Sequence, residues 1–277
     1  MQNKDLKIIS ERNRKRLMEI VYNAKAGHIG GDLSCMNVLT VLYLKVMNTD
    51  SCNPKKSDRD RFVMSKGHCV EALYAVLEAK GFISKEITDT LGKFKSPLAG
   101  HPTIQVPGVE ISSGALGHGL SVGVGMAIAA KMDNKSFKTY VLMGDGEQDE
   151  GSIYEAAMAG NQYKLDNLVA IIDRNKLQIS GTTESVMSLG NIRDRWMAFG
   201  WDVQEANGDE VDDLVCAFDK IDYQNHQPHL IIADTTKGKG VSYMENDLKW
   251  HHGMPTREQY EQAMKEIEQR IVTLENE

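Results

Sequence analysis

The sequence has few of the residues that would mark it as a secreted, zinc-binding or membrane-spanning protein. Only four of its 277 residues are cysteine, and no two of them form a Cys-x-x-Cys pair. This scarcity argues against a disulfide framework and against a zinc ribbon. No apolar run approaches the length of a membrane span, and the N-terminal segment is too charged for a signal peptide. We therefore expect a cytoplasmic protein with reduced thiols and no membrane contact.

The chain also has fewer basic than acidic residues. The chain has 32 Lys and Arg residues against 39 Asp and Glu residues, which gives a net charge of −7. Proteins that bind nucleic acids usually carry a basic face, so we expect no nucleic-acid partner. Any attraction for a phosphorylated ligand must be local. The length and the 41% hydrophobic content allow one large α/β core.

The most informative stretch runs from Lys138 to Gly181. Within it, Thr139–Met143 is a short apolar run that ends at Gly-Asp-Gly, and Leu168–Ile172 is a second such run. The segment between them has apolar residues at helical spacing. A strand, a turn, a helix and a second strand form a right-handed parallel crossover when both strands lie in one sheet.

Two polar residues follow the carboxyl ends of these strands. Asp145 follows the first strand and Asn175 follows the second. The carboxyl ends of parallel strands line one crevice, and one carboxylate with one carboxamide suits Mg²⁺, which fills its remaining positions with phosphate oxygens and water. The glycines beside Asp145 let a diphosphate approach the backbone. We infer a magnesium–diphosphate site, although Gly-Asp-Gly by itself is also a common turn.

Gly-Asp-Gly followed at this distance by Asn resembles the signature of thiamine-diphosphate enzymes. The sequence resembles transketolases in particular in three segments: residues 144–151 (GDGEQDEG), 154–168 (YEAAMAGNQYKLDNL) and 173–181 (DRNKLQISG). The resemblance covers almost the whole chain. It implies an α/β fold, with a mostly parallel central sheet flanked by helices on both faces. It also implies thiamine diphosphate and magnesium as cofactors, with the metal held by Asp145, Asn175 and the carbonyl of Leu177.

The resemblance assigns further site residues. His28, in a Gly-His-x-Gly loop, and His101, in Gly-His-Pro, would face the substrate, and His68 would contact the diphosphate. The remaining cofactor contacts would come from Gly114, Leu116, Gly146, Glu150, Asn175, Lys237 and His251. Ile29 stands where the family usually has proline, and Ala115 and His118 also depart from its pattern.

The C-terminal histidines leave a choice open. Trp250-His251-His252-Gly253 has one histidine more than the family's Trp-His-Gly. Counting from Lys237 selects His251, whereas matching His-Gly selects His252. We prefer His251 and place it with His28, His101 and Glu150 among the catalytic candidates.

Transketolases are more than twice as long as this chain, so the resemblance covers only their diphosphate-binding domain. It predicts the N-terminal subunit of a split transketolase, although a truncated chain would look the same. The partner would be a C-terminal subunit with the pyrimidine-binding and C-terminal domains, and the assembly would be a heterotetramer. Glu150 matches an interface glutamate of the family, but it could also be only a charge at a helix start.

The implied activity moves a two-carbon ketol unit from a ketose phosphate to an aldose phosphate. One alternative is another thiamine-diphosphate enzyme, either a ketol transferase for an unusual sugar phosphate or an acyl-transferring relative. A non-catalytic homologue is a further alternative, which the presence of Asp145, Asn175, His68 and His101 disfavours.

Hydrophobic periodicity predicts the remaining elements of a single domain over residues 1–277. We expect a helical region over about 1–58, in which Asp32 or Ser34 caps a helix that runs to Met47. Residues 92–107 should form an irregular loop, and 255–277 a solvated C-terminal helix. We further expect strands at 60–65, 201–205 and 229–233, and helices at 70–80, 191–199 and 210–220.

Overall fold

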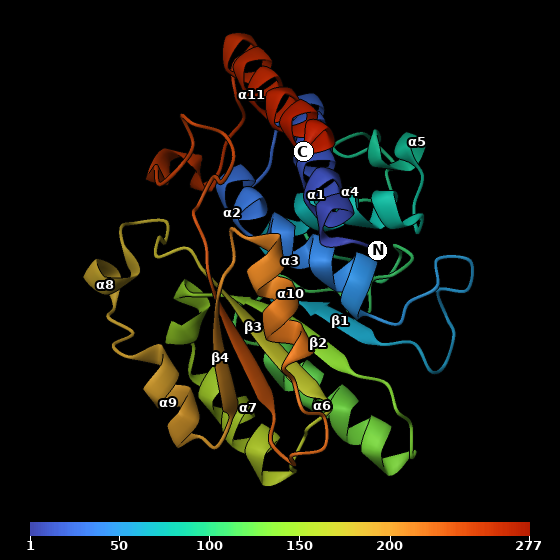
Figure 1. The fold of residues 1–277 in the computed structure, drawn as a ribbon, viewed down its shortest axis with the longest axis vertical. Coiled ribbons are helices and arrows are strands. Elements are labelled where there is room, and N and C mark those ends of the chain that lie inside the picture. The colour runs from blue at the N-terminus through green and yellow to red at the C-terminus, as the bar shows by residue number, and fades with distance from the viewer.

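A five-stranded, fully parallel sheet forms the centre of the molecule (Figure 1). The computed structural model describes all residues 1–277. The strands lie in the order β1-β2-β3-β5-β4. Their bounds are β1 (Arg61–Met64), β2 (Thr139–Gly144), β3 (Leu168–Arg174), β4 (Asp202–Asn207) and β5 (His229–Asp234). The predicted parallel sheet is confirmed, with each strand within about two residues of its expected place.

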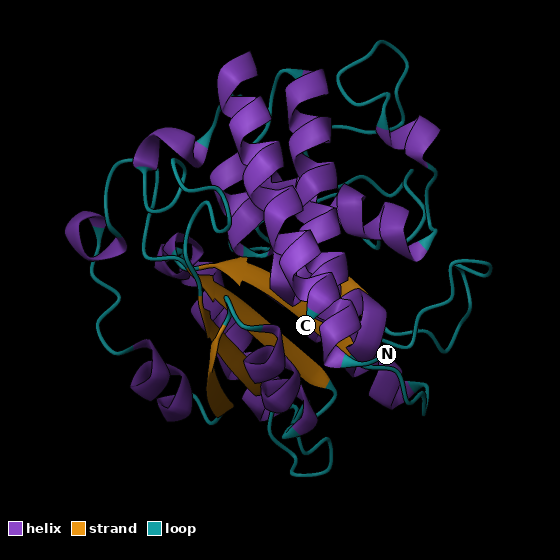
Figure 2. Cartoon of the chain, turned by 45° about the horizontal axis from the view of Figure 1, so that its top comes forward, coloured by secondary structure: helices purple, strands orange, loops and turns teal.

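Helices cover both faces of this sheet (Figures 1 and 2). One face carries α6 (Gly119–Met132), α7 (Gly151–Gln162) and α9 (Ile192–Ala198). The other face carries α1 (Asn3–Ala24), α2 (Ile29–Ser34), α3 (Met36–Val41), α4 (Val70–Lys80), α10 (Val211–Asp219) and α11 (Arg257–Asn276). Two short helices, α5 (Lys85–Thr88) and α8 (Thr183–Val186), lie in connections and were not predicted.

Alternation along the strands explains why the sheet needs both layers. Val141 and Met143 of β2 belong to the core beneath α6 and α7, whereas Tyr140 and Leu142 belong to the core on the opposite side. Successive side chains of a strand point to opposite faces, so a continuous apolar run is buried only when both faces are covered. The runs that predicted strands therefore also predicted a sheet between two helical layers.

The start of the second helix was predicted wrongly. α2 begins at Ile29, directly after His28, and not at a cap formed by Asp32 or Ser34. Asp32 instead accepts a hydrogen bond from the Ala72 amide at 2.9 Å, and Ser34 Oγ donates one to Asp173 at 2.6 Å. These tertiary partners use the side chains that would have capped the helix.

The helix is also interrupted before Met47. α3 ends at Val41, and Leu42–Val46 form a turn of π-helix. The expected single helix is therefore three short segments, all of which are packed into the core on the α1 side of the sheet.

The acidic residues that follow Gly146 do not begin α7. Residues Gly146–Asp149 form a separate turn of 3₁₀-helix, and α7 starts only at Gly151. At the other end of the chain, α11 is not a fully solvated helix. Its Ala263, Ile267 and Ile271 are buried within the core that also contains α1, because these residues recur at helical spacing on one face.

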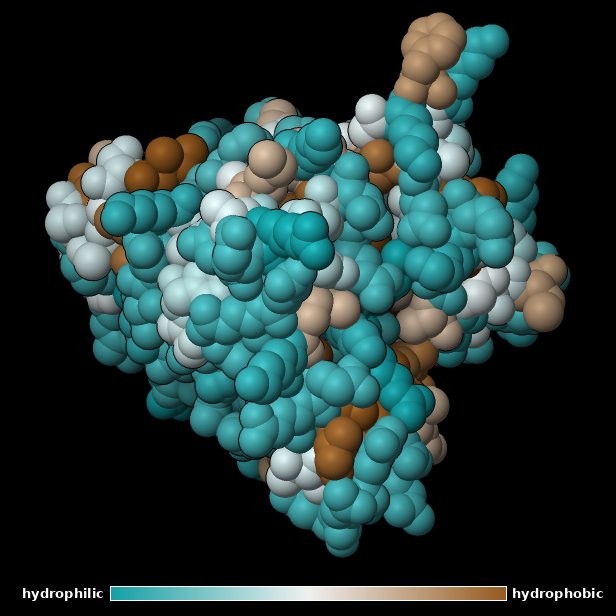
Figure 3. Space-filling model, turned by 90° about the horizontal axis from the view of Figure 1, so that it is seen from above, coloured by the Kyte–Doolittle hydropathy of each residue, from teal (hydrophilic) through white to brown (hydrophobic).

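The surface seen from above is largely hydrophilic, with small apolar areas scattered over it (Figure 3). None of the helices combines the length and the apolar character that a membrane crossing requires. All four cysteines are free thiols.

Two glycines of α6 provide a test of the packing on β2. A Cβ atom added to Gly123 would lie 2.4 Å from Val141 Cγ2, whereas one added to Gly125 would meet nothing within 4 Å. We expect Gly123→Ala to lower the free energy of unfolding by about 1–3 kcal/mol through overpacking. Gly125→Ala, the matched control, should raise it by about 0.4–1 kcal/mol because it restricts the unfolded chain.

Urea unfolding of the two variants and the unchanged chain measures this difference. Equal midpoints for Gly123→Ala and Gly125→Ala would contradict the close contact of α6 with β2.

Candidate functional site

A cavity of about 360 Å³ lies at the carboxyl ends of β2, β3 and β5. It collects residues from segments far apart in the sequence, as expected for an open parallel sheet. The predicted site residues that line it are His28, His68, Gly114, Leu116, Asp145, Gly146, Asn175, Leu177, Lys237 and His251. His101 and Glu150 do not line it.

Asp145 and Asn175 bring side-chain oxygens to this cavity. Asp145 is buried, and its Oδ1 and Oδ2 accept hydrogen bonds from the amides of Gly146 at 2.7 Å and Lys176 at 2.5 Å. Asn175 Nδ2 donates to Asp173 at 3.1 Å, and this bond fixes the plane of the carboxamide. Burial raises the pKa of Asp145, while these amides and Arg174 oppose the shift.

The donor set suits a hard cation with additional oxygen ligands. Asp145, Asn175 and the Leu177 carbonyl offer a carboxylate, an amide and a carbonyl oxygen around one cavity. Nowhere in the chain do three His, Cys, Asp or Glu side chains form a group that could hold a metal by themselves. An ion at this place would need further oxygens, such as those of a diphosphate, which is the usual manner of binding Mg²⁺.

Sequence reasoning missed a buried ion pair beside these oxygens. Lys66, at the end of β1, pairs with Asp173 near the end of β3, and both side chains are almost fully buried. Asp173 also accepts hydrogen bonds from Ser34 at 2.6 Å and from Thr235 at 2.5 Å. Burial lowers the pKa of Lys66, but the attraction of Asp173 outweighs it and holds the pKa well above its ordinary value. The sequence did contain a signal for this pair, because Lys66 and Asp173 are charged residues at the ends of two apolar strands.

Glu147, the residue after Gly-Asp-Gly, links a loop to the end of β2. It is only 2% exposed. Its Oε1 accepts hydrogen bonds from the Gly117 amide at 2.8 Å and from the Ser65 hydroxyl, and its Oε2 accepts one from the Gly144 amide at 2.9 Å. Glu147 therefore fixes the loop that carries Gly114 and Leu116 against the end of β2.

Three histidines, His28, His68 and His251, line the same cavity. The ring centre of His28 lies 5.2 Å from that of His68, 5.8 Å from that of His251 and 4.8 Å from that of His252. Burial, followed by neighbouring positive groups, lowers the pKa of His28 to about 4 and that of His251 to about 3. Both rings are therefore neutral at pH 7 and can exchange hydrogen bonds with a polar ligand.

The structure separates the two C-terminal histidines. Nδ1 of His251 lies 2.8 Å from Nζ of Lys237, and both residues line the cavity. Burial lowers the pKa of Lys237. His252 is exposed and lies outside the cavity, beside His28. Of the two histidines, only His251 therefore belongs to the cavity.

The two remaining candidates lie outside the cavity. His101 is exposed, and its ring centre lies 6.4 Å from that of His28. Glu150 is exposed immediately before α7. A Cβ atom on Gly117 would lie 2.6 Å from Glu150 Cβ, so the glutamate stands against the loop that carries Leu116.

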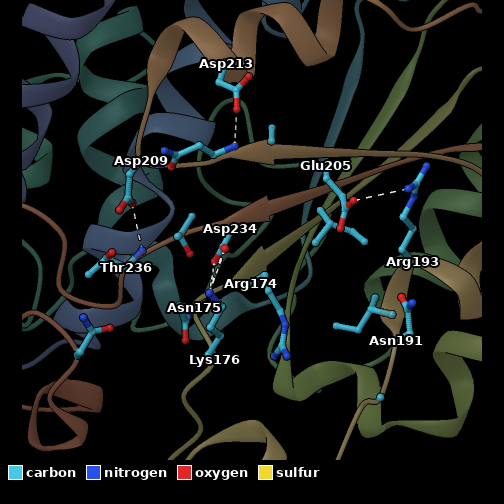
Figure 4. A pocket seen from close by; sticks show the side chains of 17 residues that line it. Arg174, Asn175, Lys176, Asn191, Arg193, Glu205, Asp209, Asp213, Asp234 and Thr236 are labelled. Carbon is cyan, nitrogen blue, oxygen red and sulfur yellow. Dashed lines mark hydrogen bonds and ion pairs between the residues drawn. The ribbon is translucent and has the colours of Figure 1, made fainter.

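A larger hollow, of about 800 Å³, lies on the far side of Asn175 (Figure 4). Its charged groups are paired with one another: Lys176 lies 2.7 Å from Asp234, and Arg193 lies 3.8 Å from Glu205. Asp209 and Asp213 accept hydrogen bonds from backbone amides. Because these charged groups already have ionic or hydrogen-bonding partners, we take the smaller cavity as the candidate functional site.

The lowered histidine pKa values predict a dependence of stability on pH. Between about pH 6.5 and pH 4 the unfolded chain binds more protons than the folded chain at His28, so stability falls as the pH falls through this range. His28→Gln should show a smaller loss on acidification. His118→Gln, which replaces an exposed ring, should behave like the unchanged chain.

Urea unfolding at several pH values measures this effect. Identical acid dependence in His28→Gln and the unchanged chain would show that His28 has an ordinary environment.

Comparison with known proteins places this geometry in a family. Residues 7–269 match the family described as transketolase, thiamine diphosphate binding domain. The chain is 72% identical over 277 residues to an apulose-4-phosphate transketolase subunit of Phocaeicola vulgatus, covering 100% of this chain and 99% of that protein. It is 41% identical to the 6-deoxy-6-sulfo-D-fructose transketolase subunit SqwG of a Clostridium species, covering 92% and 93% of the two chains.

Solved structures agree with this relationship. The transketolase from Leishmania mexicana superposes with a TM-score of 0.87 at 28% identity, covering 98% of this chain. The chain spans only 45% of the length of that protein. The sequence, the fold and the relatives thus lead to one conclusion, that this chain belongs to the transketolase family and contains its thiamine diphosphate binding domain.

Proposed function

We propose that this chain is the N-terminal subunit of a two-polypeptide transketolase, and that its cavity of about 360 Å³ holds the diphosphate end of thiamine diphosphate with Mg²⁺. The observation that carries the proposal is that Asp145, Asn175 and Leu177 line one cavity together with the neutral histidines His28 and His251. The first three residues offer oxygens for a cation. The histidines offer uncharged rings that can exchange hydrogen bonds with a polar ligand.

Within this proposal each predicted site residue that lines the cavity has a role. Asp145, Asn175 and the Leu177 carbonyl hold Mg²⁺. The diphosphate is bound by His68, Gly146, Lys237 and His251, and the pyrimidine side by Gly114 and Leu116. The bound cofactor supplies the electron sink for carbanion chemistry. The protein orients it, because Glu147 fixes the Gly117 loop and Asp173 fixes Asn175.

The substrate side is assigned to His28 and His101 at the open end of the histidine group. Their pKa values are lowered, first by burial, so both rings stay neutral and can bind sugar hydroxyls. We propose a two-carbon ketol transfer between sugar phosphates. Because the relative with 72% identity is named for apulose 4-phosphate, that ketose phosphate is the first substrate to test. The second is 6-deoxy-6-sulfo-D-fructose, for which a more distant relative is named.

A partner chain is part of the proposal. Two relatives of nearly equal length are themselves named as subunits of a transketolase, which supports a second polypeptide that carries the pyrimidine-binding and C-terminal domains. Glu150, exposed beside the cavity, is the proposed contact for that partner. α6 is apolar around most of its circumference, with Gly125 and Met132 exposed. A helix of that kind is normally buried, so we further propose self-association into a heterotetramer.

Removing the carboxylate of Asp145 tests the metal site. We expect Asp145→Ala to abolish the Mg²⁺-dependent binding of thiamine diphosphate in isothermal titration calorimetry, because a main charged ligand is lost. Asp234→Ala is the matched control, since Asp234 lies at the end of the neighbouring strand and pairs only with exposed Lys176. It should leave the binding unchanged. Unaltered affinity in Asp145→Ala would remove this residue from the site.

The proposed division of the enzyme into two polypeptides gives a second prediction. The purified chain should transfer no ketol unit by itself and should gain activity when the partner polypeptide is added. Turnover with apulose 4-phosphate and with 6-deoxy-6-sulfo-D-fructose, measured as release of the shortened sugar, separates the two substrates. Activity of the chain alone would refute the two-polypeptide arrangement.

A further inference from the structure

Two acidic side chains lie buried behind the His28 loop and take no part in the site described above. Asp32, in α2, is 0% exposed, and Glu71, in the first turn of α4, is 3% exposed. A Cβ atom on Gly27 would lie 3.6 Å from Cδ of Glu71, so this carboxyl group stands directly against the residue before His28.

The hydrogen bonds of this pair leave two oxygens without a donor. Asp32 Oδ1 accepts from the Ala72 amide at 2.9 Å. Asp32 Oδ2 and Glu71 Oε2 are both buried and receive no hydrogen bond from any donor group. Because Ala72 directly follows Glu71 in α4, its hydrogen bond to Asp32 brings the two carboxyl groups together. One proton placed between these oxygens would satisfy both of them.

The surroundings cannot neutralise two ionised carboxylates. The nearest cation is Lys66, and its Nζ is already bonded to Asp173 and to the Gly31 carbonyl. Cys69 faces the pair from the turn before α4, and α1 presents the apolar Val21 beside Gly27. The turn that precedes Gly253 packs on α2 and contributes the neutral ring of His251. Two carboxylates in contact in such a place do not both ionise.

The same pair is joined to the main chain that carries His28. The amides of Gly31 and Asp32 donate to the His28 carbonyl at 3.0 Å and 3.1 Å. Asp32 is fixed in turn to α4 through Ala72. Glu71 stands against Gly27, the residue before His28.

We propose that Asp32 and Glu71 share a single proton and that this protonated pair positions the backbone of His28. The shared proton stands independently of the reaction, whereas the importance of His28 to the substrate rests on the proposed function. Both acids are positioning residues, because neither lines the cavity.

The titration of the pair has a defined direction. Burial raises the pKa of Glu71 to about 8, although the neighbouring backbone amides and Asp32 act the other way. Burial and the repulsion of Glu71 likewise raise the pKa of Asp32. Between the ordinary carboxyl pKa and about pH 8 the folded chain holds a proton that the unfolded chain releases. Stability is therefore lost as the pH rises through this range.

A single amide substitution imitates the protonated pair and removes one of its two titrating groups. Glu71→Gln and Asp32→Asn each keep one carboxylate and one hydrogen-bond donor. In the unchanged chain we expect the melting temperature to fall by about 3 °C more than in Glu71→Gln between pH 7 and pH 8. Glu86→Gln, which changes an exposed glutamate of α5, is the matched control and should follow the unchanged chain.

Two further readouts on the isolated chain address the proton and the positioning. Infrared difference spectra between pH 7 and pH 9 should show the loss of a protonated carboxyl band in the unchanged chain and not in Glu71→Gln. The NMR ring signal of His28, assigned with His28→Gln, should shift over the same pH range only when the pair is intact. None of these measurements needs cofactor, substrate or partner, so they stand even if the transketolase activity is not found.

The outcomes are distinct. Equal pH dependence of the melting temperature in Glu71→Gln, Asp32→Asn and the unchanged chain would overturn the shared proton, as would the absence of the infrared band. A His28 ring signal whose position does not change between pH 7 and pH 9 would overturn the positioning role. If Glu71→Gln does not fold, Asp32→Asn and the infrared spectrum of the unchanged chain decide the matter.

Discussion

The buried carboxylate of Asp173 is the interaction on which the site depends. From the end of β3 it binds Lys66 at the end of β1, Thr235 after β5, Ser34 in α2 and the side chain of Asn175. One group therefore ties three strand ends and one helix together. A buried ion pair contributes little to stability compared with an apolar packing of the same volume, but removing one partner leaves an uncompensated charge and costs about 3–5 kcal/mol. We interpret its value here as the fixed relative position of the strand tips.

Around this centre the cavity combines two kinds of group. Asp145, Asn175 and Leu177 offer oxygens that suit a cation, and His28 and His251 are rings that burial and nearby positive groups keep neutral. Their neutrality matters because a protonated histidine beside a cation would repel it. The same burial that shapes the cavity thus sets the charge of its histidines.

The sequence predicted the features that arise from local pattern or from a family motif. Apolar runs of strand length located β2 and β3, and Asp145 and Asn175 at their ends predicted a common crevice, which the structure forms. It did not predict the partners of buried polar groups. Asp32, Ser34 and Glu147 have typical capping or helix-start positions in the sequence, and their bonding partners lie on elements that are remote in the chain. Such residues are fixed by tertiary contacts that no local pattern records.

The contact between Lys237 and His251 has a consequence for the form of the imidazole. The ammonium group of Lys237 can only donate hydrogen bonds, so Nδ1 of His251 must be the acceptor of the 2.8 Å bond. The single hydrogen of the uncharged ring then resides on Nε2. The lysine thereby selects one tautomer, and the ring offers a hydrogen on its remaining nitrogen without carrying a charge of its own.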